Sequence, residues 1–234
     1  MRNLVSDPAY TDADLGVPIP DDRHAVSVCL PTWDSVIGYE ESRDKVISKL
    51  QCGYPRFFIH PAVNRLFQKC EQDVAADGEK VIVFPNKGAA QRALRFVEQR
   101  SGAALRIASY DGLQALILPE DQYSLGMDYW RYSGEVVSSR QAIDVLDEGG
   151  LWEYDVTDLL RRLEGIGGYD EGDVYLYESG MSAVFSVHRE LRKLSPSKKS
   201  LQLDFPYVDV LKVQTKNLLL MFNTTLMEKL VERS

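Results

Sequence analysis

An alternation of apolar and amphipathic stretches between residues 79 and 119 constrains the fold of this chain most strongly. "KVIVFP" is a short apolar run of the kind that forms a buried strand. "KGAAQRALRFVEQRSG" has Ala90, Leu94 and Val97 on one helical face, with Gly102 near its end. "ALRIASY" and "LQALILP" read as two further strands. The order predicts a compact β-α-β-β unit and places the chain in the α/β class.

Helical patterns flank this unit on its amino-terminal side. Thr32 is placed to cap a helix that begins near Trp33, and a second helix is expected after Pro61. The first 24 residues are rich in Asp and Pro, which predicts a disordered or loosely draped leader.

The carboxyl-terminal third is organised differently. A stretch rich in Gly and acidic residues surrounds one short predicted helix, and "VYLY" then predicts a strand that leads into a helix. "LQLDFPYVDVLKV" predicts a second strand, a break at Pro206 and a further helix start. The tail is a candidate amphipathic helix. We therefore expect a disordered leader (1–24), an α/β module (25–146), a variable linker (147–172), a strand-helix-strand unit (173–216) and a divergent tail (217–234).

The overall composition limits the classes of partner. The 234 residues are 44% hydrophobic and 26% charged, as is ordinary for a globular protein, and no apolar run is long enough for a membrane helix. A net charge of −8 argues against duplex nucleic acid and against anionic membranes as partners. Since no signal-peptide segment is visible at the start, we expect a cytoplasmic protein.

Cysteine and histidine spacing indicates neither a disulfide framework nor a metal site. The three cysteines are widely spaced without a Cys-x-x-Cys pair, and the three histidines are isolated. His188 shares a helical face with apolar residues, which is more typical of packing than of catalysis. The aromatic cluster around Trp130 is likewise more typical of packing or an interface than of nucleotide stacking.

"DVYLYESGMSAVFSVHREL" places Ser179 and Gly180 where a strand would meet a helix. A helix start presents unpaired backbone N–H groups and the positive end of the helix dipole. Glycine lets an anion approach the backbone and serine adds a hydroxyl donor, so the joint could hold a phosphate. The alternative is that Ser179 is an N-cap and Gly180 a tight turn. The sequence by itself leaves both interpretations open.

Several motifs in order resemble one family. "YLYESGMSAVFSVHREL" is similar to the Ser-Gly-Met helix of the pyridoxal-phosphate enzymes of cysteine and methionine metabolism. "AVSVCLPTWDSVIGYEE", "GYPRFFIHPAV", "YWRYSGEVVSSRQA" and "LDFPYVDVLKV" resemble fungal cystathionine γ-synthase with its long amino-terminal extension, over roughly residues 24 to 145 and 173 to 216. The resemblance implies a fungal-type α/β module followed by the start of a cofactor-binding domain of the aspartate aminotransferase type (fold type I), apparently incomplete.

The resemblance also implies a function and a cofactor site. The family joins cysteine to an activated homoserine ester by γ-replacement, on the route from cysteine to methionine, with pyridoxal 5'-phosphate. Carried over by position, Ser179, Gly180 and Met181 would hold the cofactor phosphate, and Tyr207 would stack on its ring. A half-buried loop tyrosine is the alternative for Tyr207. Residues 138–140 match a motif of the fungal extension, in which Arg140 would meet an anion or form a structural ion pair.

The departures from the family pattern bear on activity. The family's cofactor-binding lysine and the aspartate that protonates the pyridine nitrogen have no counterpart, because the resemblance ends near Lys216 and Lys212 lies on the wrong segment. No catalytic residue is therefore assigned. We expect a truncated, amino-terminal piece of the enzyme that is inactive alone and binds cofactor poorly if at all.

Two alternatives and a set of partners follow. A non-catalytic module of this kind would bind a full-length paralogue or form a homo-oligomer, while amino acids are the substrates of the parent enzyme. A free-standing α/β protein without cofactor chemistry is the remaining alternative, and it would need residues 173–234 to close a core of their own.

Overall fold

The structure is a computed structural model, and it describes residues 3–147, 155–170, 172–198 and 207–215. Its central feature is a three-stranded sheet of order β3-β5-β4, in which β5 pairs antiparallel with both neighbours. Leu116 of β5 lies between Ile82 of β3 and Ile107 of β4, so one apolar row crosses the sheet. The strands and their crossover helix are β3 (Glu79–Phe84), α4 (Lys87–Ser101), β4 (Arg106–Tyr110) and β5 (Leu113–Pro119).

This arrangement confirms the predicted β-α-β-β unit and the α/β class. Asn86 caps α4 by accepting a hydrogen bond from the Ala89 amide (2.9 Å), and Gly102 ends the helix in the left-handed conformation. The sequence did not indicate that β5 inserts between β3 and β4, because the pairing partner of a strand is set by side-chain packing across the sheet.

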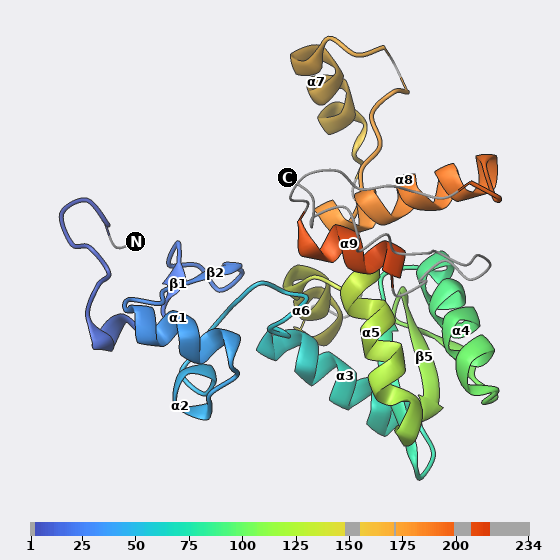
Figure 1. Cartoon of the computed structure of the whole chain (residues 1–234), viewed down its shortest axis with the longest axis horizontal. Helices are drawn as coiled ribbons and strands as arrows, with labels where there is room; N and C mark the ends of the chain where they lie inside the picture. Colours follow the sequence, from blue (N-terminus) through green and yellow to red (C-terminus); the bar gives the residue numbers. More distant parts are fainter. Residues whose placement is uncertain (1–2, 148–154, 171, 199–206, 216–234) are drawn as a thin grey trace, which may run out of the picture.

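Further helices surround the sheet (Figure 1). They are α3 (Pro61–Val74), α5 (Tyr123–Ser133), which follows the 3₁₀ turn Glu120–Gln122, and α6 (Ser139–Asp147). On α5, Gly126 allows close approach to the sheet, since a Cβ there would lie 2.6 Å from Ile82 Cδ1. Trp130 of the same helix is buried and donates from its indole to the Val83 carbonyl (3.2 Å), which confirms packing as the role of the aromatic cluster.

Tyr129 joins the elements of the core. Its ring lies 5.3 Å from that of Phe96 on α4 and 6.2 Å from that of Phe84 on β3. It also meets Phe185 of α8 (Gly180–Leu194) edge-on at 5.9 Å. One continuous apolar core therefore includes α8 together with the sheet.

The amino-terminal segment contains the 3₁₀ turn Asp12–Asp14, the strands β1 (Pro18–Ile19) and β2 (Ser27–Val28), and the helices α1 (Trp33–Glu40) and α2 (Asp44–Ile47). Thr32 caps α1 as predicted, by accepting from the Ser35 amide (3.1 Å). The sequence predicts a disordered or loosely draped leader over 1–24, and its described part is exposed over most of its length but has defined backbone partners. The Gly16 amide donates to the Cys29 carbonyl and its carbonyl accepts from the Gln51 amide, both at 3.0 Å, so backbone pairing holds this segment.

The strand-helix-strand prediction for 173–216 needs a second correction. Helices α8 and α9 (Val208–Thr215) form, but residues 174–177 are not a strand. Tyr175 of this segment is 73% exposed, and the segment pairs with none of the described strands. The second predicted strand, at 201–205, and the tail 217–234 lie outside the described residues.

The predicted linker carries one short helix, α7 (Thr157–Gly167), and none of its residues is buried. Figure 1 shows α7 standing away from the rest of the chain. Within the described ranges, none of the helices combines the length and the apolar character that crossing a bilayer requires.

His24 attaches the amino-terminal segment to α6. Its Nε2 accepts a hydrogen bond from Arg23 Nε (3.1 Å), so Nδ1 carries the proton and donates to Ser139 Oγ (2.9 Å). Burial, followed by the nearby charges of Arg140 and Arg23, lowers the pKa of His24 from 6.5. The neutral ring is therefore the form that the fold stabilises.

We expect the free energy of unfolding to fall as the pH drops below about 6.5. A histidine whose pKa is lowered by folding contributes stability that is complete above its unfolded pKa and is lost as the pH falls through the folded value. Urea denaturation at about pH 7.5 and pH 5.5 measures the loss. His24→Gln is expected to reduce it without abolishing it, because burial also lowers the pKa of His188. An equal loss in both proteins would contradict this role.

Candidate functional site

Helix α8 begins at Gly180, directly after its N-cap Ser179, because two serines cap it reciprocally. The Ser179 hydroxyl accepts from the Ser182 amide and the Ser182 hydroxyl accepts from the Ser179 amide, each at 3.0 Å. This capping box satisfies one orphan N–H group of the first turn and fixes the direction in which the helix leaves. The N-cap interpretation of Ser179 is thus confirmed.

The Ser179 hydroxyl also donates to the Gly134 carbonyl at 2.8 Å. Gly134 has φ of +72° and ends α5, and a Cβ at this position would lie 2.6 Å from Ser179 Oγ and 2.7 Å from the Ser182 amide nitrogen. Two helix ends therefore meet at a residue that has to be glycine. The only proton of the Ser179 hydroxyl is used inside the chain, so a phosphate would have to displace the Gly134 carbonyl to receive it.

Gly180 and Met181 differ in what they can offer. The Met181 side chain is buried in the core, which leaves its backbone amide as the group that could meet a ligand. Gly180 is exposed, and a Cβ there would meet nothing within 4 Å. The open space, the two first-turn amides and the positive end of a 15-residue helix fit a phosphate oxygen.

A charged network lies beneath this helix start. Glu135 is buried and forms an ion pair with Arg92 of α4, and it accepts a hydrogen bond from the Tyr129 hydroxyl (2.8 Å). Arg189 of α8 approaches the same carboxylate at 4.0 Å. Burial raises the pKa of Tyr129 well above its ordinary value, so the hydroxyl remains a donor. The network fixes α8 against α4 and α5.

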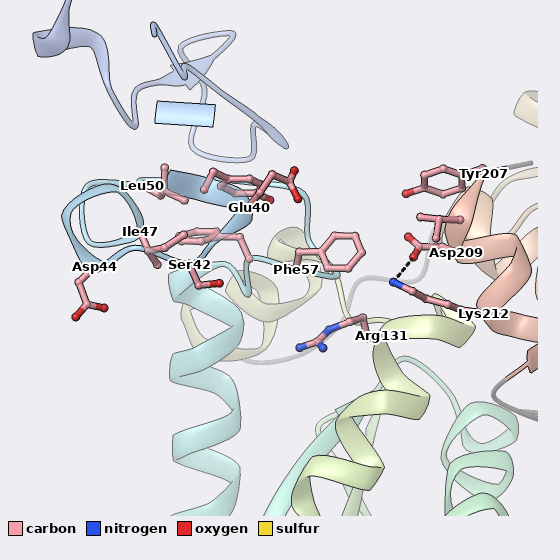
Figure 2. Close-up of a pocket in the computed structure, with 13 residues that line it drawn as sticks. Glu40, Ser42, Asp44, Ile47, Leu50, Phe57, Arg131, Tyr207, Asp209 and Lys212 are labelled. Carbon is pink, nitrogen blue, oxygen red and sulfur yellow. Dashed lines mark ion pairs between the residues drawn. The ribbon is translucent and has the colours of Figure 1, made fainter. Parts of the chain in front are cut away.

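Tyr207 lies at the start of α9 and lines a different space. A pocket of about 720 Å³ is bounded on one side by the α1–α2 segment and on the other by α5 and α9 (Figure 2). The Tyr207 hydroxyl accepts a hydrogen bond from Arg56 (3.2 Å), and the residue is 54% exposed. Among the described residues, no hydrogen bond, ion pair or ring contact joins Tyr207 to residues 179–181. The predicted phosphate and ring contacts thus lie in two separate environments here.

Arg56 and Asp209 form a buried ion pair behind this pocket. The guanidinium Nη2 lies 2.7 Å from Asp209 Oδ2, and each side chain is 1% exposed. Nη1 of Arg56 donates to the Arg131 carbonyl (3.1 Å), and the rings of Tyr54 and Phe57 lie about 5 Å from the guanidinium carbon. Burial opposes ionisation of Asp209, but hydrogen bonds from Arg56 and Tyr207 hold its pKa below the ordinary value.

Sequence reasoning missed this pair, because its members are separated by 153 positions. Both lie in motifs that carry the family resemblance, "GYPRFFIHPAV" and "LDFPYVDVLKV", and this is the only signal that singles them out. Arg140, in contrast, is exposed on α6 and makes no ion pair with a described residue, so the predicted structural ion pair is not found there.

The cysteines are sequestered thiols. Cys29, Cys52 and Cys70 are buried, and none of them is paired in a disulfide within the described residues. Burial raises the pKa of Cys70 to about 12, so its reactive thiolate form is suppressed. Across the described ranges, no three His, Cys, Asp or Glu side chains are grouped as metal ligands would be.

Residues 62–138, which comprise the sheet and α3 to α5, match the family described as the N-terminal domain of fungal trans-sulfuration enzymes. The chain is 29% identical over 177 residues to cystathionine gamma-synthase of Saccharomyces cerevisiae, with 68% of the chain and 26% of that protein covered. It is 33% identical over 160 residues to cystathionine gamma-synthase of Neurospora crassa, with 55% of the chain and 25% of that protein covered.

A longer alignment joins the chain to a cystathionine gamma-synthase-like enzyme of Amanita muscaria, which is 24% identical over 318 residues and covers 92% of the chain and 51% of that enzyme. The chain thus spans about a quarter of the length of the two cystathionine gamma-synthases. No solved structure matches it.

We predict that Asp209→Asn lowers the free energy of unfolding by about 3–5 kcal/mol, because it leaves the Arg56 charge buried without a counter-charge. The double variant Arg56→Met/Asp209→Leu is expected to recover most of this loss, since apolar side chains need no partner. Urea denaturation provides the measurement.

Asp158→Asn is the matched control, because Asp158 pairs with Arg161 at 2.6 Å while remaining 94% exposed. It is expected to leave the unfolding midpoint unchanged. If Asp209→Asn behaved in the same way, the buried pair would not hold α9 in place.

Proposed function

We propose that this chain serves trans-sulfuration, on the premise that it belongs to the fungal trans-sulfuration proteins related to cystathionine γ-synthase. The observation that carries the proposal is the match of residues 62–138, because this segment forms the sheet and most of the apolar core. The reaction of the parent enzyme would be γ-replacement, in which cysteine displaces the leaving group of an activated homoserine ester. Amino acids are then the substrates.

The proposed cofactor is pyridoxal 5'-phosphate, which when bound withdraws electrons from the substrate carbon next to the amino group. The amides of Gly180 and Met181 would bind its phosphate at the start of α8. Ser179 would keep this turn in register through its bond to Gly134, and it would meet the phosphate only by giving up that bond. Tyr207 would face the cofactor ring only if α9 and α8 came together differently from the arrangement described.

We further propose that this chain alone does not turn over substrate. No lysine of the chain matches the family residue that binds the cofactor covalently, and no residue is assigned to proton transfer. The chain would contribute its α/β module and its phosphate-binding turn, and the remaining groups would come from elsewhere in a complete assembly.

We expect pyridoxal phosphate to bind the purified chain weakly and reversibly, with Gly180→Glu weakening it by about tenfold because a carboxylate at the helix start repels a phosphate. Fluorescence quenching of the chain during titration measures binding, and a γ-replacement assay with cysteine and an activated homoserine ester measures turnover. Gly165→Glu is the matched control, since Gly165 lies on α7 and also has open space around it.

If pyridoxal phosphate bound Gly180→Glu as strongly as Gly165→Glu, the phosphate site would not lie at the start of α8. Turnover by the chain alone would contradict the proposed inactivity and leave the phosphate site unaffected. The two measurements therefore test the two parts of the proposal separately.

A second candidate is a non-catalytic module that binds a full-length paralogue or a second copy of the chain. The outward face of α8 favours it, because Val187, Leu191 and Leu194 follow one another at helical spacing and are all exposed. Apolar side chains that follow one helix face in this way are typical of interaction surfaces.

We expect the chain to co-purify with a full-length cystathionine γ-synthase, and the double variant Val187→Asp/Leu191→Asp to lose the complex because charge is placed in an apolar contact. Lys193→Asp is the matched control, since Lys193 is exposed on the same helix. Failure of the unaltered chain to co-purify would exclude a full-length cystathionine γ-synthase as its partner.

A further inference from the structure

The pocket in Figure 2 has the size of a small-molecule site. Its volume is about 720 Å³, within the range of roughly 300–1,000 Å³ that such sites occupy. Its walls come from parts of the chain that are distant in sequence, namely the α1–α2 segment, the residues around Phe57, and the helices α5 and α9. It does not include the start of α8, so it is separate from the proposed phosphate site.

Arg131 supplies a positive charge that none of the described side chains neutralises. Its Nε donates to the Arg56 carbonyl (3.2 Å), which fixes the base of the guanidinium, and the group makes no ion pair with any described residue. In Figure 2 its terminal nitrogens point into the space below Phe57. Lys212, in contrast, is held by Asp209 at 3.4 Å and by the Tyr132 ring. A fixed guanidinium is suited to bind a carboxylate through two parallel hydrogen bonds.

Aromatic rings border the same space. Phe57 is 45% exposed and Tyr207 is 54% exposed, although both are aromatic residues next to a buried ion pair. Figure 2 shows both rings at the edge of the pocket. Rings in such positions pack against flat apolar ligands in offset-stacked or edge-to-face geometry.

The wall formed by α1 and α2 carries the opposite charge. Glu40 and Asp44 line the pocket there, and Glu40 makes no ion pair with a described residue. A ligand with a second negative charge would meet these carboxylates and be repelled. The wall therefore favours a ligand with a single anionic group, oriented toward Arg131.

We propose that this pocket binds a small aromatic monocarboxylate. The carboxylate pairs with Arg131, the ring packs against Phe57 and Tyr207, and Glu40 excludes dianions. The proposal goes beyond the proposed function, since it concerns a different pocket and a ligand without phosphate.

Calorimetric titration of the full chain with 3-phenylpropionate tests it, with 3-phenylpropanamide as the uncharged ligand of the same shape. We expect saturable binding of the acid and at least about tenfold weaker binding of the amide, because a charge-assisted hydrogen-bond pair is lost. Arg131→Met should weaken binding of the acid by a similar factor, and Arg131→Lys should weaken it by a smaller factor. Arg140→Met is the matched control, and should bind as the unaltered chain does.

The acidic wall is tested with 3-(4-carboxyphenyl)propionate, which is expected to bind more tightly to Glu40→Gln than to the unaltered chain. Near-ultraviolet circular dichroism checks that each variant is folded. If Arg131→Met does not fold, the ratio of the affinities for acid and amide and the affinity of Arg131→Lys for the acid test the role of Arg131 instead. Absence of saturation, equal affinity for acid and amide, or inorganic phosphate binding as tightly as the acid would overturn the proposal.

Discussion

The buried ion pair between Arg56 and Asp209 joins two parts of the chain that lie outside the sheet. It fixes the start of α9 against the loop before α3, and through the Arg131 carbonyl it also contacts the end of α5. Burying two charges costs free energy of desolvation unless close pairing and hydrogen bonds offset it. Arg56 Nε and Asp209 Oδ1 lack a hydrogen-bond partner among the described residues, so the pairing is incomplete. The pair is better understood as a device for positioning than as a source of stability, and the pocket beside it exists because α9 is held there.

Local patterns predicted the central unit well, because its elements are specified by contacts close in sequence. The apolar run of β3, the Gly102 end of α4 and the Thr32 cap of α1 are each readable within one or two turns. The predictions that differ from the structure concern elements that depend on contacts distant in sequence. "VYLY" has the composition of a strand, but a strand also needs a partner, and this segment pairs with none of the described strands. The leader likewise depends on distant backbone partners that its composition does not reveal.

The candidate site shows the same division. Ser179 as a helix cap follows from its neighbours, whereas its bond to Gly134 and the burial of Glu135 between helices follow only from the assembled core. Family resemblance added Met181 and Tyr207 by position to the helix start at Gly180, without indicating that Tyr207 lies at another pocket. The contacts of Arg56 with Asp209 and with Arg131 could be recognised only in three dimensions, because each of them joins residues more than 70 positions apart in the sequence.

The placement of Phe185 in the central core has a consequence for how the chain responds to cleavage. Helix α8 follows α7, which buries no residue, and the exposed segment around Tyr175. Phe185, Met181 and the Arg189 contact to Glu135 hold α8 to the sheet module without help from that connection. A protease that nicked the chain near Tyr175 would thus cut a tether and leave a two-piece complex. The two pieces should co-migrate in a native gel and separate only in denaturant. The exposed connection around Tyr175 is therefore not a boundary between separately folded parts, because α8 belongs to the core of the sheet module.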